Sequence, residues 1–519
     1  MSKTRRILSG LLAIVLIATI FIGCNGGTGS SGSSATESSA ASSAADSSEP
    51  ASTDDGGEES SEAPAPSGDF KEVTLKFTTI GNSQPDTARI SQAASDYLKS
   101  IGKPYSVEIN IVEWSAYNDV VNLMLNSGEK FDVVFTANWA ASYYANVPNG
   151  VFAPLNDYLA ANPEIEEILT ADFMNAAQVN GVNYALPTNK EKARQVGMLF
   201  RKDIVDAMGM DITTVKTKED MEQWMVKAKE EHGLWTWPNF IPMDRQPDIL
   251  EERLLSLSYD GSGTVVATDL TPEFKESLVL LNKWYNMGLI SPNLTRDTVA
   301  QQELASGSTF GLGSQLKPGK DTEESASVGY ELVQVPLNEP EIANTETTGA
   351  MLAIPVASDN KDEAFDFIKL LYTDKEFVNI FVWGQEGTDY TKVDDNTVEI
   401  IGDSGWDWGQ GWTLGNQFND YLTTAEDPQK WEKFEEFNEQ GKPLMALGFM
   451  PDSSSTEIQT YISTLKATRD NFLDLLSFGY VDDIDGELAR LEAQYNAAGM
   501  QELITEYQRQ FDEWQASKG

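Results

Sequence analysis

The stretch 72–139 reads EVTLKFTTIGNSQPDTARISQAASDYLKSIGKPYSVEINIVEWSAYNDVVNLMLNSGEKFDVVFTANW, and it decides the fold. It contains three strand patterns that alternate with two helical patterns. The strand patterns occupy residues 72–77, 105–113 and 131–139, and the helical patterns occupy residues 87–101 and 117–126. Strands that alternate with helices of this length predict a parallel sheet in the order β-α-β-α-β.

Polar and aromatic residues follow the ends of these strands. Asn82 comes after the first strand, Trp114 after the second, and Asn138, Trp139 and Tyr143 after the third. Ligands of parallel sheets bind beyond the carboxyl ends of the strands. The sequence therefore predicts that these residues line a binding site.

The N-terminus indicates export. Lys3, Arg5 and Arg6 precede an uncharged, mostly apolar run that ends just before Cys24. The run is shorter than the ~20 residues that cross a bilayer, so residues 1–23 are predicted to be a signal peptide. Cys24 is the only cysteine of the chain, and the sequence FIGC looks like a bacterial lipobox. We expect lipidation at Cys24, with a leftover buried or free cysteine as the alternative.

Residues 24–68 have no means of building a core. They include fourteen Ser and eight acidic residues, but no Lys, Arg, Val, Leu, Ile or aromatic residue. Apolar burial cannot offset the entropy of ordering such a segment. We expect a disordered tether between a membrane lipid and a folded body that begins at residue 69 and is long enough for two domains.

The chain is strongly acidic, with a formal net charge of −44. This charge repels phosphate backbones and other anionic polymers, so nucleic acid is not an expected partner. Neutral or cationic ligands are favoured over strongly anionic ones. The alternative explanation is a general surface acidity that keeps an exported protein soluble.

Twelve Trp residues occur, and two clusters of them stand in segments rich in Gly, Asn or Asp. A pyranose ring has a flat CH face that stacks on an indole, while nearby carboxylates and amides bind its hydroxyls. The candidates are Trp235, Trp237 and Asn239 in LWTWPN, and Trp406, Trp408 and Trp412 in GWDWGQGW. The alternative for each Trp is a role as core filler, although the glycines disfavour a helix or strand interior.

Several kinds of catalytic site are disfavoured. The sequence has no G-x-S-x-G nucleophile elbow and no G-x-x-x-x-G-K-[ST] phosphate loop. Its single histidine, His232, lies at the end of a charged helical pattern, and zinc is not expected with one His and no available thiol. No cofactor or metal is predicted. A pair of catalytic carboxylates cannot be tested among 81 acidic residues, so a glycoside hydrolase stays open.

Several stretches together carry a resemblance. The first are WSAYNDVVNLMLNSGEKFDVVFTANW, VFAPLNDYL, NGVNYALPTNKE, GMLFRKDIVDAMGM, STFGLGSQ and TGAMLAIP. The later ones are GNQFNDYL, WEKFEEFNEQ, KPLMALGFMPDSS and YNAAGMQELITEYQRQFDEW. They resemble the extracellular solute-binding proteins of ABC importers in the maltodextrin-binding class (family 1). The match is to the lipoprotein subgroup with a helical C-terminal extension, which takes up oligosaccharides.

The resemblance implies an α/β fold of the two-lobed, periplasmic-binding-protein-like type (type II), with a hinge and a helical C-terminal region. Lobe 1 is expected at residues 69–188 and 347–400, lobe 2 at residues 189–346, and the C-terminal region at residues 401–519, packed mainly on lobe 2. In this family, positions such as Lys190, Glu191 and Glu346 line the cleft near the hinge. Trp383 and Glu386 complete the candidate set. A plain surface role is the alternative for the three charged residues.

The resemblance also implies a function. The expected protein is a monomeric receptor, lipid-anchored at the extracellular face of a bacterial membrane. It captures an oligosaccharide between its lobes, delivers it to the transmembrane permease subunits of an ABC importer, and is not an enzyme. A peptide receptor and a secreted glycoside hydrolase are the alternatives.

Overall fold

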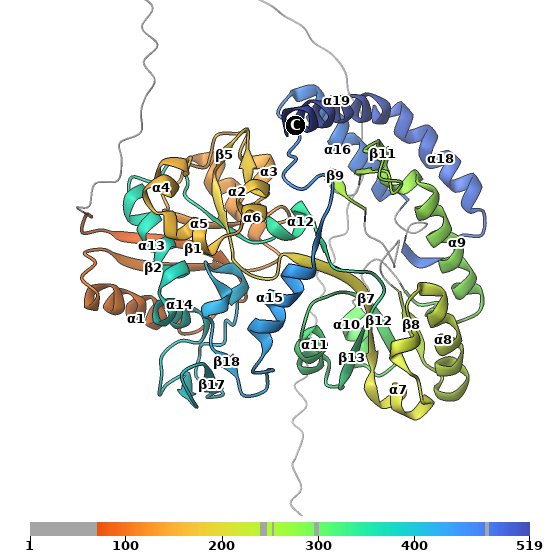
Figure 1. The fold of residues 1–519 in the computed structure, drawn as a ribbon, viewed down its shortest axis with the longest axis horizontal. Helices are drawn as coiled ribbons and strands as arrows, with labels where there is room; N and C mark the ends of the chain where they lie inside the picture. Colours follow the sequence, from red (N-terminus) through yellow and green to blue (C-terminus); the bar gives the residue numbers. More distant parts are fainter. Residues whose placement is uncertain (1–69, 239–246, 252–253, 295–299, 473–476, 519) are drawn as a thin grey trace, which may run out of the picture. The chain divides into compact units, whose positions relative to one another are not determined.

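The computed structural model describes residues 70–518 except for 239–246, 252–253, 295–299 and 473–476. The expected signal peptide and tether, with Cys24, lie outside the described residues, and so does Asn239. The described residues form one compact unit, in which two sheets organise the chain (Figure 1). Within the described part, the helices lack the combination of length and apolar character that a membrane span needs.

The first sheet has the strand order β2-β1-β3-β15-β6. Its strands are β1 (Thr74–Ile80), β2 (Ser106–Val112), β3 (Val133–Thr136), β6 (Ala185–Pro187) and β15 (Met351–Ala353). Strand β1 pairs in parallel with both β2 and β3, and helices α1 (Thr87–Ser100) and α2 (Tyr117–Ser127) connect them. The predicted parallel β-α-β-α-β order is therefore confirmed. Strand β15 is antiparallel to both of its neighbours.

The helices of this lobe follow their apolar spacing. Ile90, Ala94 and Leu98 recur every four residues of α1, and all three are buried on one face. Helix α2 ends at Gly128, whose φ of 69° is left-handed and favours glycine. The other elements of lobe 1 are α3 (Tyr143–Asn146), α4 (Asn156–Ala161), α5 (Pro163–Ile168), α6 (Ala171–Ala176), the hairpin β4–β5 (Gln178–Val179, Val182–Asn183), α13 (Lys361–Thr373) and α14 (Lys375–Val382).

The second sheet has the order β19-β14-β7-β12-β8, with β13 also paired to β7. Its strands are β7 (Ala193–Arg201), β8 (Trp235–Trp237), β12 (Thr309–Leu316), β13 (Leu332–Pro336), β14 (Glu341–Ile342) and β19 (Lys442–Pro443). The structure corrects the expectation that Trp235 and Trp237 stand outside regular structure. They form β8, which pairs in parallel with β12, because the alternation of large and small residues in LWTW suits a pleated strand.

Helices cover the second sheet. They are α7 (Lys202–Met208), α8 (Lys218–His232), α9 (Pro272–Asn286), α10 (Ala300–Ala305) and α11 (Lys320–Val328), with short 3₁₀ turns at Ile212–Thr214 and Thr268–Leu270. Helix α8 begins with a capping box in which the side chains of Thr217 and Asp220 bond each other's backbone N–H. It ends at His232, as predicted, followed by Gly233.

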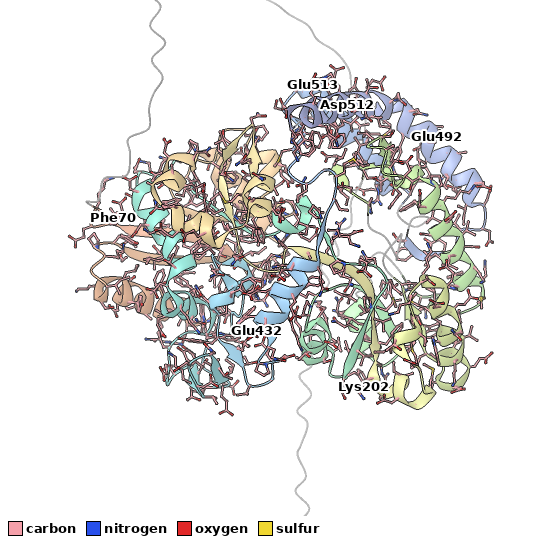
Figure 2. The ribbon with its side chains drawn as sticks, viewed as in Figure 1. Phe70, Lys202, Glu432, Glu492, Asp512 and Glu513 are labelled. Atoms are coloured by element: carbon pink, nitrogen blue, oxygen red, sulfur yellow. The ribbon has the colours of Figure 1, made fainter. Side chains whose placement is uncertain are left out.

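A third core joins the end of the chain to the second lobe. Strands β9 (Ile249–Glu251), β10 (Leu255–Leu257) and β11 (Val265–Ala267) form a small sheet, and α16 (Thr456–Asp470), α18 (Ile484–Ala497) and α19 (Met500–Lys518) pack on it and on α9. Exposed acidic side chains such as Glu492, Asp512 and Glu513 project from α18 and α19 (Figure 2).

One part of the expected C-terminal region lies elsewhere. Residues 401–419 stay with lobe 1, because Trp406, Trp408 and Leu414 are buried in its core. They are followed by β18 (Leu422–Thr423), which pairs with β17 (Thr397–Ile400) in a small sheet that also contains β16 (Tyr390–Lys392). The chain then enters α15 (Lys430–Gln440), which contacts β7. The chain thus passes between the two large sheets three times, after β6, after β14 and after β18.

Candidate functional site

Three indoles meet at the carboxyl ends of the first sheet. The ring centroid of Trp114 lies 6.2 Å from that of Trp139 and 6.3 Å from that of Trp412, and the latter two are 6.3 Å apart. Their planes differ by only 14°, 17° and 32°. We call these three residues the indole cluster. Trp114 and Trp139 keep 38% and 42% of their surface exposed, so the cluster offers apolar ring area to solvent.

Separate parts of the chain position these rings. Trp114 follows β2, Trp139 follows β3, and Trp412 lies in the 3₁₀ turn Gly411–Thr413. The indole N–H of Trp139 donates to the carbonyl of Gly349 at 2.9 Å, and that of Trp412 donates to Oε1 of Gln410 at 2.8 Å. The rings of Phe135 and Trp412 are perpendicular, at 89°, with centroids 5.9 Å apart. Trp139 and Trp412 are therefore held in place before any ligand arrives.

A cavity of about 300 Å³ opens beside Trp139, and we call it the side cavity. One wall comes from lobe 1, through Asn138, Ser142, Tyr144 and Ala145. Other lining residues come from β9 and from the C-terminal region, and Asn344 and Thr345 of the second crossing also line the cavity. The C-terminal lining residues are Phe449, Pro451, Ser453, Gln459, Ile462 and Lys466. Side chains of both lobes thus face one space next to the indole cluster.

Helix α12 (Asn344–Thr347) carries the second crossing past this cavity. The side-chain amide of Asn138 donates to the carbonyl of Thr345 at 2.6 Å, which ties the lobe 1 wall to the helix. The guanidinium of Arg194, on β7, donates to the hydroxyl of Thr345 at 3.0 Å and lies 3.5 Å from the carboxylate of Glu346. Arg194 and Glu346 are both buried, so this pair anchors α12 to the second sheet.

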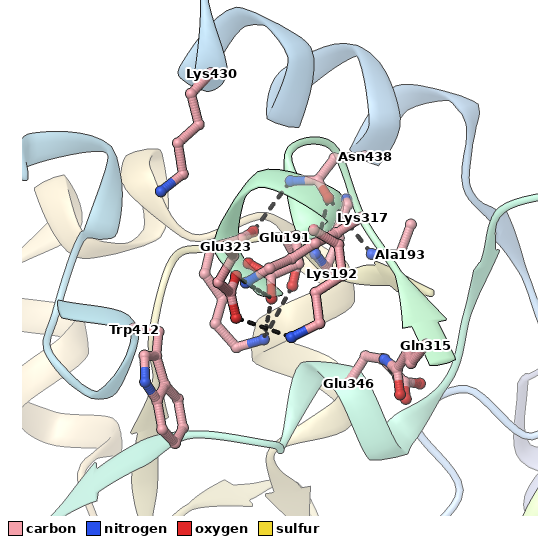
Figure 3. Close-up of polar contacts among 12 residues, drawn as sticks. Glu191, Lys192, Ala193, Gln315, Lys317, Glu323, Glu346, Trp412, Lys430 and Asn438 are labelled. Atoms are coloured by element: carbon pink, nitrogen blue, oxygen red, sulfur yellow. Dashed lines mark hydrogen bonds and ion pairs between the residues drawn. The ribbon is translucent and has the colours of Figure 1, made fainter. Parts of the chain in front are cut away.

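A second group of charges follows the first crossing, and we call it the charge cluster: Lys190, Glu191, Lys317 and Glu323. Figure 3 labels the last three of these residues. The carboxylate of Glu191 lies 3.4 Å from the ammonium groups of both Lys190 and Lys317. Burial alone would raise the pKa of Glu191, but the two ammonium charges hold that pKa down at about 2. In the same way, Glu191 and Glu323 keep the pKa of Lys317 above its usual value despite burial.

The structure thus brings together Trp114, Trp139, Trp412 and Asn138 at one edge, with Lys190, Glu191 and Glu346 at the crossings. Figure 3 shows Trp412 and Glu346 on opposite sides of the charge cluster in that view. Asn82 is exposed at the end of β1.

Three other candidates are buried in the core of lobe 1. The indole N–H of Trp406 donates to the carbonyl of Phe381, and that of Trp408 donates to the carbonyl of Ile80. Tyr143 is fully buried and donates its hydroxyl to the carbonyl of Ala177. The predictions that these three side chains face a ligand are therefore corrected: each is apolar enough to fill a core and finds a backbone acceptor there.

The remaining candidates stand apart from the indole cluster. Trp235 lies under the ammonium of Lys229, 4.1 Å from its ring centroid, and Trp237 packs on the core of the second sheet. Trp383 donates its N–H to the carbonyl of Tyr421 at 3.0 Å, beside the small sheet β16–β18. Glu386 is exposed, and its backbone forms an isolated β-bridge with Tyr390 in the same region.

Sequence reasoning missed several residues of the site. Tyr143 was predicted to face the ligand, but its neighbour Tyr144 lines the side cavity instead. Consecutive side chains of a helix point in different directions, and both residues lie in α3. No sequence pattern pointed to Arg194 or Thr345, because a single Arg in a strand and a Thr near a crossing are common in sequences without a binding role. The cavity wall from Phe449 to Lys466 looked like helix packing alone.

Metal binding finds no support in the described part of the chain. No group of three or more His, Cys, Asp or Glu side chains is placed there to hold an ion. The arrangement offers apolar ring faces, amides and fixed charges, which suit reversible binding of a polar organic molecule.

Comparison with known proteins decides the family. The family model described as "Bacterial extracellular solute-binding protein" matches residues 81–376. The chain belongs to this family. The members of the family are solute-binding proteins, so this solute-binding protein is not an enzyme, and the hydrolase alternative is set aside. Residues 445–516 match a domain of unknown function (DUF3502), which covers most of the C-terminal helices.

Two relatives extend the comparison. This solute-binding protein is 25% identical over 472 residues to a carbohydrate ABC transporter substrate-binding protein of Streptococcus pneumoniae serotype 4, and the alignment covers 88% of this chain and 94% of that relative. It is 24% identical over 215 residues to the lipoprotein LipO of Bacillus subtilis, covering 38% of this chain and 41% of that relative.

Solved structures share the two-lobed fold. The N-glycan transport solute binding protein NgtS of Streptococcus pneumoniae superimposes with a TM-score of 0.77 at 23% identity, covering 86% of this chain and all (100%) of that one. Its complex with Man5GlcNAc gives a TM-score of 0.70 at 24% identity, with 86% and 99% covered. An HMO-binding protein of Bifidobacterium longum infantis gives 0.63 at 17% identity, with 85% and 99% covered. The two-lobed α/β fold expected for this solute-binding protein is confirmed.

Proposed function

We propose that this chain is the lipid-anchored substrate-binding subunit of an ABC importer and that its ligand is an oligosaccharide. The observation that carries the proposal is the indole cluster, whose partly exposed rings stand beside a cavity lined from both lobes. The pneumococcal relative, named for carbohydrate transport, supports the same ligand class.

The geometry suits a neutral sugar. A pyranose ring that stacks on Trp114 or Trp139 buries its CH face, while its hydroxyls stay free to bond amides and carboxylates at the rim. A ligand that touches both lobes gains contacts in the closed form that it lacks in the open form, and this differential affinity drives closure. Release to the permease subunits then needs only the reverse change, with no bond made or broken in the ligand.

The membrane anchor and the partners form the finer part of the proposal. Lipidation of Cys24 would hold the chain at the outer face of the membrane, and the segment 25–68 would link the lipid to the folded body as a flexible tether. The folded body would act as a monomer that docks on the permease subunits. The similarity to a protein named as a lipoprotein supports the lipid anchor.

A thermal-shift screen of the purified chain against oligosaccharides and short peptides tests the ligand class. A ligand at 100 times its Kd stabilises the folded state by about 2.7 kcal/mol. We expect oligosaccharides to raise the melting temperature and to be recovered unchanged by mass spectrometry. Stabilisation by peptides alone would establish a peptide receptor instead, and conversion of a bound glycan would contradict the proposal.

Replacement of Cys24 tests the anchor. We expect the wild-type chain in the membrane fraction of an exporting bacterium and the Cys24→Ser variant in the medium. Ser39→Cys, paired with Cys24→Ser, is the matched control, because it restores a cysteine at a position that lacks the lipobox. Equal release of wild type and Cys24→Ser would contradict lipid anchoring.

A further inference from the structure

We propose that the side cavity is a subsite for the acetamido group of an N-acetylated sugar, whose pyranose ring stacks on the indole cluster at Trp139. This inference rests on the oligosaccharide-binding function proposed above and names the chemical class that the site selects. It follows from three properties of the cavity wall: its apolar face, its satisfied polar groups and its balanced charge.

Apolar side chains make up part of the cavity lining outside lobe 1. They include Ile249, Leu250, Phe449, Pro451 and Ile462. Leu250, Phe449 and Ile462 belong to the third hydrophobic core, so they are held rigidly and cannot turn away from the cavity. A hydroxyl pushed against this surface would lose its water without gaining a partner, whereas a methyl group would gain from burial.

Most polar groups of the wall are already bonded within the protein. The amide of Asn344 donates to the carbonyls of Ala446 and Phe449 at 2.9 and 2.8 Å and accepts the N–H of Gly448 at 2.8 Å. The hydroxyl of Tyr144 bonds that of Thr348 at 2.8 Å. These groups of the wall are therefore already engaged and are not available to the hydroxyls of a sugar ring.

Among the polar groups of the wall that stay available, two match an acetamido group. The hydroxyl of Ser142 makes no hydrogen bond with the described side chains or backbone. Gln459 donates its amide N–H to the carbonyl of Ser453 at 2.8 Å, and its amide oxygen stays available as an acceptor. One donor and one acceptor are what an acetamido group needs for its carbonyl and its N–H. Its methyl group then meets the apolar side.

Charge at the cavity argues against an acidic sugar. The ammonium of Lys466 lies 2.8 Å from the carboxylate of Glu251, whose other oxygen accepts the hydroxyl of Tyr507 at 2.9 Å. The pair is internally balanced, so a ligand carboxylate would find no free cation there and would be repelled by Glu251. A neutral substituent fits this environment best.

Chitotriose and cellotriose provide the test, since they share one β-linked glucose backbone and differ only in an acetamido group or a hydroxyl at each C2. We expect calorimetry on the full purified chain to show chitotriose binding tighter by on the order of tenfold, the discrimination that one buried small apolar group typically gives. Saturation-transfer NMR should show the acetyl methyl as the ligand group closest to the protein.

Ala145→Phe tests the location. Ala145 lines the cavity but is exposed on α3, so a larger side chain can fill the space without disturbing the core. We expect this variant to lose the preference for chitotriose. Ala489→Phe on α18, also exposed but away from the cavity, is the matched control and should keep the preference.

The outcomes separate this inference from the function on which it rests. Equal affinity for the two trisaccharides, or a preference that survives Ala145→Phe, overturns the subsite and leaves oligosaccharide binding intact. Binding of other glycans but of neither trisaccharide overturns the subsite as well. A chain that binds no glycan at all overturns both proposals.

Discussion

At the scale of single residues, substitution of Trp114 tests the indole cluster separately from the side cavity. Its ring faces both Trp139 and Trp412, it is 38% exposed, and it does not line the side cavity. We expect Trp114→Ala to weaken oligosaccharide binding by roughly tenfold, or about 1.4 kcal/mol, because one stacking face is lost. Calorimetry measures this change. Tyr480→Ala, with a ring of similar exposure on another surface, is the control and should leave affinity unchanged.

Glu191 links the charge cluster to acid stability. Its pKa is about 2 in the folded protein against 4.5 normally, because the charges of Lys190 and Lys317 outweigh its burial. A carboxylate with a depressed pKa stabilises the fold above its unfolded pKa, and this stabilisation is lost as pH falls from about 4.5 toward 2. We expect Glu191→Gln to lower the free energy of unfolding by about 3 kcal/mol at pH 7. The difference from wild type should shrink toward pH 2.

Urea unfolding at a series of pH values measures that difference. The matched control is Glu492→Gln, since Glu492 is exposed on α18 (Figure 2) and forms no ion pair with a described residue. A deficit of the Glu191 variant that is constant between pH 7 and pH 2 would show that packing, rather than charge, is the cause.

At the scale of elements, the short helix α12 connects three regions. Its first residue, Asn344, bonds the segment 446–449 through three hydrogen bonds, while Thr345 is bonded by Asn138 of lobe 1 and Arg194 of β7. We expect Asn344→Ala to destabilise the fold by about 3 kcal/mol, because buried backbone groups lose their partners. Chemical unfolding measures this loss.

Hydrogen exchange adds a local readout for the same variant. The amide of Gly448 should exchange faster in Asn344→Ala, because its acceptor is gone. Asn126→Ala is the control: Asn126 is exposed and bonds only within α2, so neither stability nor exchange near residue 448 should change. Unaltered exchange at Gly448 would contradict the role of Asn344 as its acceptor.

The elements also show how far sequence could lead. The first sheet was predictable because its alternation and its glycine stops are local signals, and β1, β2 and β3 form within a few residues of the predicted places. Trp114 and Trp139 became candidates through the rule that ligands bind beyond the carboxyl ends of parallel strands. Trp406 and Trp408 did not, because an indole among glycines looks the same whether it meets a ligand or donates its N–H to a backbone carbonyl in the core.

The side cavity lay beyond sequence reasoning for another reason. Its walls come from residues that are far apart in the chain, such as Ala145, Leu250 and Gln459, and no local pattern predicts that they meet. Arg194 likewise reveals its role only through tertiary contacts with Thr345 and Glu346. Local periodicity predicts elements, whereas a binding surface arises from contacts of long sequence separation.

At the scale of the whole molecule, the net charge makes oligosaccharides and peptides distinguishable as ligands by the salt dependence of their binding. A chain with a formal charge of −44 attracts cations from every side, and this attraction weakens as the Debye length falls from about 30 Å at 0.01 M salt to about 3 Å at 1 M. Stacking of a neutral glycan on the indole cluster involves no net charge and should not respond to that screening.

We therefore expect the Kd of an oligosaccharide to change by less than about twofold between 0.01 M and 1 M salt, whereas a lysine-rich peptide that binds through the acidic surface should weaken by more than about tenfold. Fluorescence titration of the intrinsic Trp signal measures both. An uncharged peptide of equal length is the control for peptide binding as such. A glycan whose affinity falls steeply with salt would place its main contacts on the charged groups instead of the indole faces.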